Sequence, residues 1–267
     1  MHQTGACAGE RSSIITQEIL IERMTWEEIK HAIATGKRRV VVMIGAMEQH
    51  GPHLPIGTDT MLGYAIGERL ARALGDALVA PVIPVGYSIG HINFPGTISI
   101  PEDLLQALIR EWCRCLAHHG FTEIILAPSH GGNYRALREV VPSLQEELKG
   151  RARIVAFTDI EPWIAFYRDF SIAQGKDPAR VGVHAAQGET SMMLAADPEL
   201  VHMERAVEGF LGDASARWRN KVPDPMETVS PTGILGDARG STAEFGEAML
   251  RVKIEKMRRE CGERGSR

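Results

Sequence analysis

The stretch VVVMI (residues 40–44) and the segment GAMEQHGPHLPIGTDT (residues 45–60) that follows it decide the fold class of this chain. A continuous apolar run with β-branched side chains is typical of a short strand buried on both faces of a parallel sheet. The next segment contains too much Gly and Pro for a helix. We therefore expect a rigid loop that leaves the carboxyl end of a buried strand.

This pattern of strand, loop and helix recurs along the chain. It predicts strands near residues 40–44, 77–85, 123–127 and 153–157, and helices near residues 25–36, 60–74, 102–119, 133–149, 162–170 and 241–260. Thr25 with Glu28, and Ser241 with Glu244, fit the capping-box pattern, and Asn133 is expected to cap a third helix. The alternation predicts an α/β fold with a mostly parallel sheet covered by helices on both faces, where ligands bind at the carboxyl ends of the strands.

Composition limits the class of protein. The net charge of −4, with no basic stripe, argues against a nucleic-acid partner. No apolar run approaches the roughly 18 residues of a membrane span, so no membrane partner is expected. The 4 cysteines form no C-x-x-C pair, which argues against a disulfide framework and favours the cytoplasm. We interpret residues 1–14 as a flexible N-terminus and residues 15–267 as a single domain.

Five side chains at the ends of predicted strands or in loops have the chemistry of metal ligands. Glu48 and His50 are two residues apart and point to the same side of an extended segment, and Asp59 returns after a Pro/Gly turn. His130 follows the third strand, and Glu189 is the remaining candidate. Carboxylates with imidazoles suit zinc, manganese or iron(II). Five ligands exceed what one catalytic zinc usually takes, so we expect two divalent ions that share a carboxylate.

Other polar residues near these positions have two interpretations. His53 either orients a ligand or serves only the turn that contains it. Gly131, Gly132 and Asn133 form either an anion-binding turn or a close backbone approach, and we favour the second.

Four segments carry a family resemblance. GAMEQHGPHLPIGTDT, FPGTIS (94–99), SHGGN (129–133) and HAAQGETS (184–191) resemble, in the same order, the signatures of the creatininase or creatinine amidohydrolase family. The resemblance extends from about Ile15 to Pro198. It implies a three-layer α/β/α fold, a dinuclear metal centre, hydrolysis of a non-peptide C–N bond, and often a hexamer.

The resemblance also implies roles for individual residues. One ion would be held by Glu48, Asp59 and His130, and the other by His50, Asp59 and Glu189, so that Asp59 bridges the two ions. His184 matches the family histidine that acts as general acid and base beside the substrate, a role suited to an imidazole pKa near neutrality.

Two departures from creatininase concern the substrate. Creatininase carries an acidic residue where this chain has Gly132, and aromatic residues where it has Arg180 and Val181. Creatinine is therefore not the expected substrate. Arg180 could instead recognise a carboxylate, a phosphate or several hydroxyls, or lie on the surface. His91 and Phe94, in the loop after the second strand, are expected to line the substrate pocket.

Together these features predict a cytoplasmic, metal-dependent amidohydrolase that binds two Zn, Mn or Fe ions and a small-molecule substrate. A metal-bridging hydroxide would attack the carbonyl carbon of a cyclic amide, ureide or formamide, and His184 would protonate the leaving group. Cleavage of a C–C bond in a cyclic ketone derived from a sugar or inositol is an alternative. A non-catalytic metal-binding or peptide-maturation accessory protein is another. Assembly into a homo-oligomer is expected from the resemblance.

Overall fold

The central sheet contains four parallel strands. The computed structural model describes residues 18–212 and 225–265, and within them the strand order is β2-β1-β3-β4. The strands are β1 (Arg39–Ile44), β2 (Ala77–Val79), β3 (Glu123–Pro128) and β4 (Arg153–Ala156). The predicted α/β fold with a parallel sheet is confirmed. Residues 1–14, predicted to be a flexible terminus, lie outside the described residues.

β1 lies in the interior of the sheet, as its apolar run predicts. The side chains from Val40 to Ile44 are fully buried. β1 pairs with β2 on one side and with β3 on the other. The register places Ile44 opposite Pro128, so β1 and β3 end side by side. The loops that carry Glu48 and His130 therefore leave the sheet at neighbouring points.

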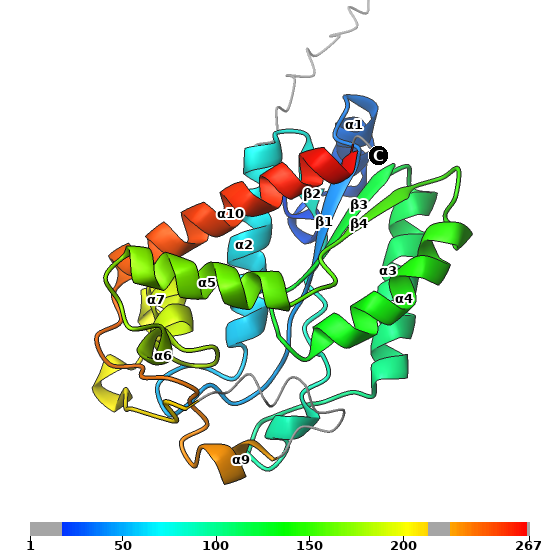
Figure 1. Cartoon of the computed structure of the whole chain (residues 1–267). Coiled ribbons are helices and arrows are strands. Elements are labelled where there is room, and N and C mark those ends of the chain that lie inside the picture. The colour runs from blue at the N-terminus through cyan, green and yellow to red at the C-terminus, as the bar shows by residue number, and fades with distance from the viewer. Residues whose placement is uncertain (1–17, 213–224, 266–267) are drawn as a thin grey trace, which may run out of the picture.

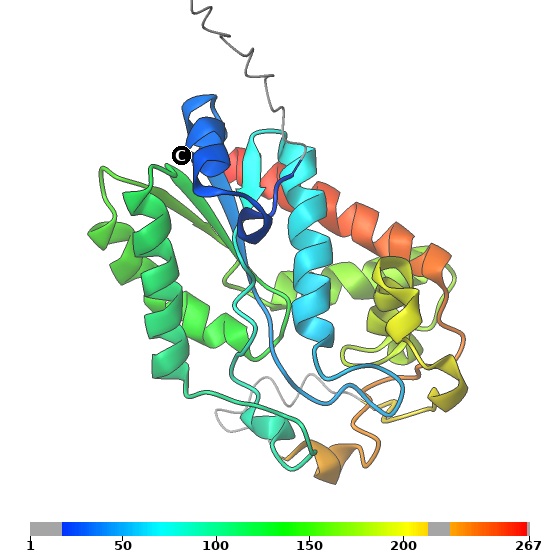
Figure 2. The same ribbon diagram turned by 180° about the vertical axis from the view of Figure 1, so that it is seen from behind.

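Helices cover both faces of the sheet, as Figures 1 and 2 show. On one face, α3 (Glu102–His118) packs against α4 (Asn133–Glu147). On the other face, α2 (Thr58–Leu74) packs against α10 (Ala243–Gly265), and α5 (Glu161–Ala173) and α7 (Gln187–Ala196) lie beside α10. The three-layer α/β/α architecture is thus confirmed.

Shorter elements connect these layers. They are α1 (Trp26–Ala34), α6 (Pro178–Val181), α9 (Met226–Val229), and the 3-10 helices η1 (Ile21–Arg23), η2 (Ile89–His91), η3 (Pro198–Leu200) and η4 (Met203–Arg205). The capping box of Thr25 and Glu28 forms at α1 as predicted. Within the described ranges, the helices are too short or too polar to cross a bilayer.

Three local predictions were wrong. The strand predicted over residues 77–85 ends at Val79, because Pro81 and Pro84 lack the N–H donors that a ladder needs. Asn133 is not an N-cap: Gly132 occupies that position, and Asn133 lies in the first turn of α4. At α10, the hydroxyl that accepts a helix N–H belongs to Thr242, whereas Ser241 donates to the Ala238 carbonyl.

Two helices begin at residues that matter for the site. α2 starts at Thr58 rather than near residue 60, so Asp59 lies in its first turn. Glu189 lies in the first turn of α7. Carboxylates at these positions face the positive ends of the helix dipoles, which favours their ionised form.

Candidate metal centre

The structure brings all five predicted ligands together at the carboxyl end of the sheet. Glu48 and His50 come from the loop after β1, Asp59 from α2, His130 from the loop after β3, and Glu189 from α7. Glu48 and His50 have no exposed surface, Asp59 is 1% exposed and His130 is 5% exposed. Three carboxylates and two imidazoles therefore meet in the interior of the molecule.

Asp59 lies between the two imidazoles. Its Oδ1 is 3.6 Å from Nε2 of His50, and its Oδ2 is 3.4 Å from Nδ1 of His130. Glu48 Oε1 is 3.3 Å from His130 Nδ1, and Glu189 Oε2 is 3.7 Å from His50 Nε2. The two oxygens of Asp59 thus face separate halves of the cluster, each half containing one imidazole and one further carboxylate.

Hydrogen bonds to backbone carbonyls fix the tautomers of both imidazoles. Nδ1 of His50 lies 3.1 Å from the Glu48 carbonyl, and Nε2 of His130 lies 3.0 Å from the Tyr87 carbonyl. In each ring the nitrogen that donates to a carbonyl points away from the cluster. When the ring is neutral, the inward nitrogen therefore carries the lone pair that a metal ion needs.

The inward atoms lack partners among the described residues. Both carboxylate oxygens of Glu48, Nε2 of His50 and Oδ2 of Asp59 are buried and form no hydrogen bond. Leaving buried acceptors unpaired is costly, and here they all face one another. Bound cations would satisfy these atoms. The donor set, oxygen and nitrogen without thiolate, fits zinc, manganese or iron(II).

The charges within the cluster depend on one another. Burial opposes protonation of His50, but the carboxylates of Asp59, Glu189 and Glu48 together outweigh it and raise the pKa of His50 to about 10. Burial raises the pKa of Asp59, but His50 and His130 outweigh this effect and hold the pKa far below its usual range. Burial, with Asp59 and Glu48 nearby, raises the pKa of Glu189 to about 7. Without a cation, protons on the imidazoles balance the carboxylates.

His184 adjoins the cluster through Nδ1. This atom is 3.5 Å from Glu48 Oε1 and 3.9 Å from Glu189 Oε2. Its other nitrogen, Nε2, lies 3.0 Å from both the carbonyl oxygen and the side-chain nitrogen of Gln49. Burial, followed by the charge of His50, lowers the pKa of His184 well below its usual value, so the ring is neutral at neutral pH.

Gln49 is a site residue that the sequence analysis missed. The Gly51 N–H donates to its Oε1, which fixes the orientation of the amide. Its Nε2 lies within 3.1 Å of Nδ1 of His91, Nε2 of His184 and the Gly233 carbonyl. The side chain of Gln49 is not among the usual ligands of these metals. Its position in the sequence between Glu48 and His50 was therefore the only indication that it belongs to the site.

His91 contacts the cluster of candidate ligands but is not among the residues that line the cavity beside it, so its predicted role in the pocket stays a prediction. Its Nε2 is 3.7 Å from Glu48 Oε1, and its ring centroid is 4.7 Å from that of His184. Phe94 is half-buried, and its N–H donates to the His91 carbonyl, but its side chain does not line the cavity beside the cluster.

Gly132 permits the hydrogen bond that orients His130. A Cβ at this position would lie 2.2 Å from the Tyr87 carbonyl oxygen and 2.4 Å from His130 Nε2, the two atoms that form that bond. The favoured interpretation, a close backbone approach, agrees with this geometry. Asn133 accepts the Tyr87 N–H and donates to the carbonyls of Ile44 and Gly45, so it holds the loop beside β1.

Arg180 lies away from the cluster. Its side chain is 46% exposed and pairs with Asp237 and Glu208. It does not line the cavity beside the metal ligands. In the part of the chain that the structure describes, Arg180 therefore contacts neither the metal ligands nor this cavity.

Two residues orient Glu189. Ala185 has a φ of +50°, uncommon for a residue with a side chain, and its N–H donates to Glu189 Oε2 at 2.6 Å. His53 Nε2 lies 2.8 Å from the hydroxyl of the adjacent Thr190. Burial, followed by His50, lowers the pKa of His53 to about 4, so this ring is neutral. Of its two interpretations, the geometry fits that of a residue that orients a ligand.

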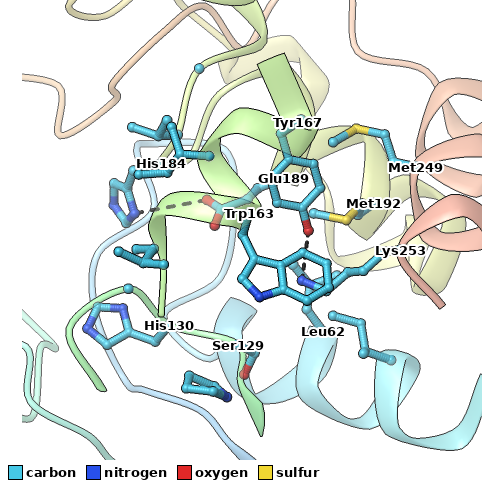
Figure 3. Close-up of a pocket in the computed structure, with 18 of the residues that line it drawn as sticks. Leu62, Ser129, His130, Trp163, Tyr167, His184, Glu189, Met192, Met249 and Lys253 are labelled. Atoms are coloured by element: carbon cyan, nitrogen blue, oxygen red, sulfur yellow. Dashed lines mark hydrogen bonds and ion pairs between the residues drawn. The ribbon is translucent and has the colours of Figure 1, made fainter. Parts of the chain in front are cut away.

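A cavity of about 110 Å³ opens beside the cluster. His130, His184 and Glu189 form one side of it, and Lys253 from α10 lies on the other (Figure 3). The remaining lining is mostly apolar or aromatic and includes Leu62, Ile66, Trp163, Tyr167, Met192 and Met249. The sequence analysis did not predict that α5 and α10 contribute to the site.

Comparisons with known proteins identify similar chains. The family model described as Creatininase, creatinine amidohydrolase, matches residues 22–261. The chain is 30% identical to creatinine amidohydrolase of Pseudomonas putida over 259 residues, which cover 90% of this chain and 95% of that protein. It is 32% identical to mycofactocin precursor peptide peptidase of Mycolicibacterium smegmatis over 219 residues, 79% of each chain.

A more distant relative and a solved structure extend this set. The chain is 26% identical to 3-dehydro-scyllo-inosose hydrolase of Thermotoga maritima over 269 residues, which cover 92% of this chain and 84% of that protein. The solved structure "Creatininase Mn" superposes with a TM-score of 0.78 and 27% identity, covering 93% of this chain and 99% of that chain.

Proposed function

The chain belongs to the creatininase family of metal-dependent hydrolases, and we propose that it hydrolyses the C–N bond of a small cyclic amide, ureide or formamide at a centre of two divalent metal ions. The observation that carries this proposal is the position of Asp59. Its two oxygens face separate imidazoles, and each imidazole is accompanied by a further carboxylate. Such an arrangement suits two ions that share one bridging ligand.

The residues divide into two sets around Asp59. Glu48 and His130 would complete the first set, and His50 and Glu189 the second, as the distances between their inward atoms suggest. When bound, the ions supply Lewis-acid polarisation of a carbonyl group and activation of water. The buried walls exclude bulk solvent, which strengthens electrostatic interactions within the site.

His184 is suited to move a proton at Nδ1, the nitrogen that faces the cluster. With a proton on Nε2, that atom donates to the Gln49 carbonyl, and Nδ1 can accept a proton from water. With a proton on Nδ1, Nε2 accepts from the Gln49 amide, and Nδ1 can donate to a leaving nitrogen. Gln49 therefore provides a hydrogen-bond partner for Nε2 in either neutral tautomer of His184. This favours a role for His184 as general acid and base.

Metal analysis and a substrate panel test the proposal. Protein purified without chelator should contain about two transition-metal ions per chain. The panel comprises lactams, cyclic ureides, formamides, short peptides and cyclic ketones, assayed with manganese and with zinc, since the relatives include a peptidase and an inosose hydrolase. Turnover confined to peptides or ketones would replace the proposed substrate class, and a folded protein that binds no metal would contradict the dinuclear centre.

Two variants separate the proposed roles. Glu189→Ala should lower both metal content and turnover, because it removes an inward carboxylate. His184→Ala should retain the metals and reduce turnover by about 100-fold or more, because it removes only the proton-transfer group. Loss of the metals in His184→Ala would show that His184 is a ligand instead.

A further inference from the structure

Lys253 is a buried cation inside the cavity beside the cluster. The residue is 8% exposed, and it enters the cavity from α10. Its Nζ donates to the Tyr167 hydroxyl at 2.7 Å and lies 5.2 Å from the centre of the Trp163 ring. Figure 3 shows Lys253 and Tyr167 on the opposite side of the cavity from His130 and His184.

No carboxylate among the described residues forms an ion pair with Lys253. Glu189 and Asp59 favour its charged form only at a distance, and burial lowers the pKa of Lys253 to about 8. The neighbouring Lys256 is different, because it lies against the same Trp163 ring but pairs with Glu260 at 2.7 Å. A buried ammonium without a carboxylate partner is unfavourable, so its presence in a cavity points to a ligand that supplies one.

The donors of this pair determine the kind of ligand. An ammonium has three N–H donors, and Lys253 uses one of them, on Tyr167. Burial, followed by the charge of Glu189, raises the pKa of Tyr167, so its hydroxyl keeps a proton that it can donate. The two side chains thus offer several donors and one positive charge. A complementary group has two acceptor oxygens and one negative charge, as a carboxylate has.

We propose that Lys253 and Tyr167 bind a carboxylate of the substrate, whose apolar middle part occupies the cavity while its scissile bond lies at the metal ligands. This inference rests on the proposed function only for the position of the scissile bond. The apolar side chains of Leu62, Met192 and Met249, which line the same cavity, suit a short hydrocarbon spacer. A phosphate is a poorer match, because its second charge would face a single ammonium.

A binding experiment tests the carboxylate site without turnover. The probes are hexanoate and hexanamide, which differ in charge but not in length, titrated calorimetrically into the metal-loaded protein. Wild-type protein should bind hexanoate at least about tenfold more tightly. Lys253→Met should abolish this preference and leave the affinity for hexanamide unchanged. Lys256→Met is the matched control, because it removes the other cation beside Trp163, and it should retain the preference.

Tyr167→Phe provides a second variant. It removes one donor while keeping the ring, and should reduce the preference for hexanoate about threefold to tenfold. If Lys253→Met fails to fold, the reduced preference for hexanoate in Tyr167→Phe tests the carboxylate site instead. Equal binding of both probes by the wild type would overturn the inference. So would a preference that persists in Lys253→Met, because hexanoate would then be bound elsewhere, as at the metal ions themselves.

A kinetic experiment separates this inference from the proposed function. The substrates are ω-formamido carboxylates with three to five methylenes and their neutral carboxamide analogues. The wild type should show a kcat/KM about tenfold higher for the carboxylates, and Lys253→Met should lose only this advantage. Equal turnover of charged and neutral formamides would overturn the inference and keep the proposed function. Absence of turnover, with hexanoate binding that depends on Lys253, would support the inference and contradict formamide hydrolysis.

Discussion

At the scale of single residues, Asp59 is the ligand that contacts both halves of the cluster. Each of its oxygens faces a different imidazole, so no other described side chain can replace it. Its carboxylate also holds the pKa of His50 high, which shows how strongly these groups interact. Removing its charge should therefore affect both halves of the cluster.

We expect Asp59→Asn to lower the metal content from about two ions to less than one per chain, because the amide has no charge and a single acceptor oxygen. Elemental analysis of the purified variant measures this. Asp76→Asn is the matched control, since Asp76 pairs with Arg39 at 3.3 Å near the surface. Two ions retained in Asp59→Asn would contradict the bridging role.

Metal binding should release protons, and its affinity should rise with pH. In the metal-free cluster, burial opposes protonation of both imidazoles. The carboxylates of Asp59, Glu189 and Glu48 nevertheless raise the pKa of His50 to about 10, and those of Glu48 and Asp59 raise the pKa of His130. Both rings are then protonated at pH 7, whereas a ligand nitrogen must be neutral. Each proton displaced makes the apparent affinity about tenfold higher per pH unit.

Calorimetric titration of the metal-free protein in buffers of different ionisation enthalpy counts these protons. We expect between two and three protons per two ions bound near pH 7, two from the imidazoles and a fraction from Glu189, and an affinity that increases between pH 6 and pH 8. A heat of binding that does not depend on the buffer would show that the imidazoles are already neutral.

At the scale of elements, the sequence predicted β1 and the loop after it because their signals are local. A run of apolar β-branched residues, followed by Gly and Pro, has few other structures available. The register that places Ile44 opposite Pro128 then brings His130 beside Glu48. The loop positions of Glu48 and His130 could be predicted because they follow strand ends directly, whereas Asp59 and Glu189 lie in the first turns of α2 and α7.

Other parts of the site depend on packing between distant elements. Lys253 and Tyr167 are separated by 86 residues, and nothing in either helix indicates that they meet. Asn133 was predicted as a helix cap from its residue type, but its side chain finds stronger partners in three backbone groups near β1. Tertiary contacts therefore overrode the local preference.

The start of α10 allows a prediction about helix capping. The Thr242 hydroxyl accepts the Phe245 N–H, so Thr242→Ala should lower the free energy of unfolding by about 1 kcal/mol. Ser241→Ala should have a smaller effect, because Ser241 bonds only to the Ala238 carbonyl in the preceding turn. Chemical denaturation of both variants measures the difference. A larger decrease in the free energy of unfolding for Ser241→Ala than for Thr242→Ala would indicate that Ser241 caps the helix, as predicted from the sequence.

At the scale of the whole molecule, we propose that copies of the chain assemble. Four large apolar side chains are exposed within one segment, between η2 and the start of α3: Ile89, Ile92, Ile98 and Leu104. Clustered exposed apolar residues are typical of interaction surfaces. The family resemblance implies six chains.

Sedimentation or light scattering tests this assembly. We expect a mass of about six times 29.3 kDa for the wild type and a smaller one for Ile98→Lys. Ile172→Lys is the control, because Ile172 is equally exposed on α5, outside that segment. A monomeric wild type would contradict the proposal.

The distribution of the ligands along the chain has a consequence for thermal stability. The ligands span the chain from Glu48 to Glu189 and converge only when the sheet and both helix starts are formed. An unfolded chain does not hold all five together, so we expect metal ions to bind the native state much more tightly than the unfolded chain. By mass action, the melting temperature should rise with the free metal concentration, even though no ligand lies in a strand. The fraction of the protein that stays folded at a given temperature should therefore depend on the concentration of free metal ions.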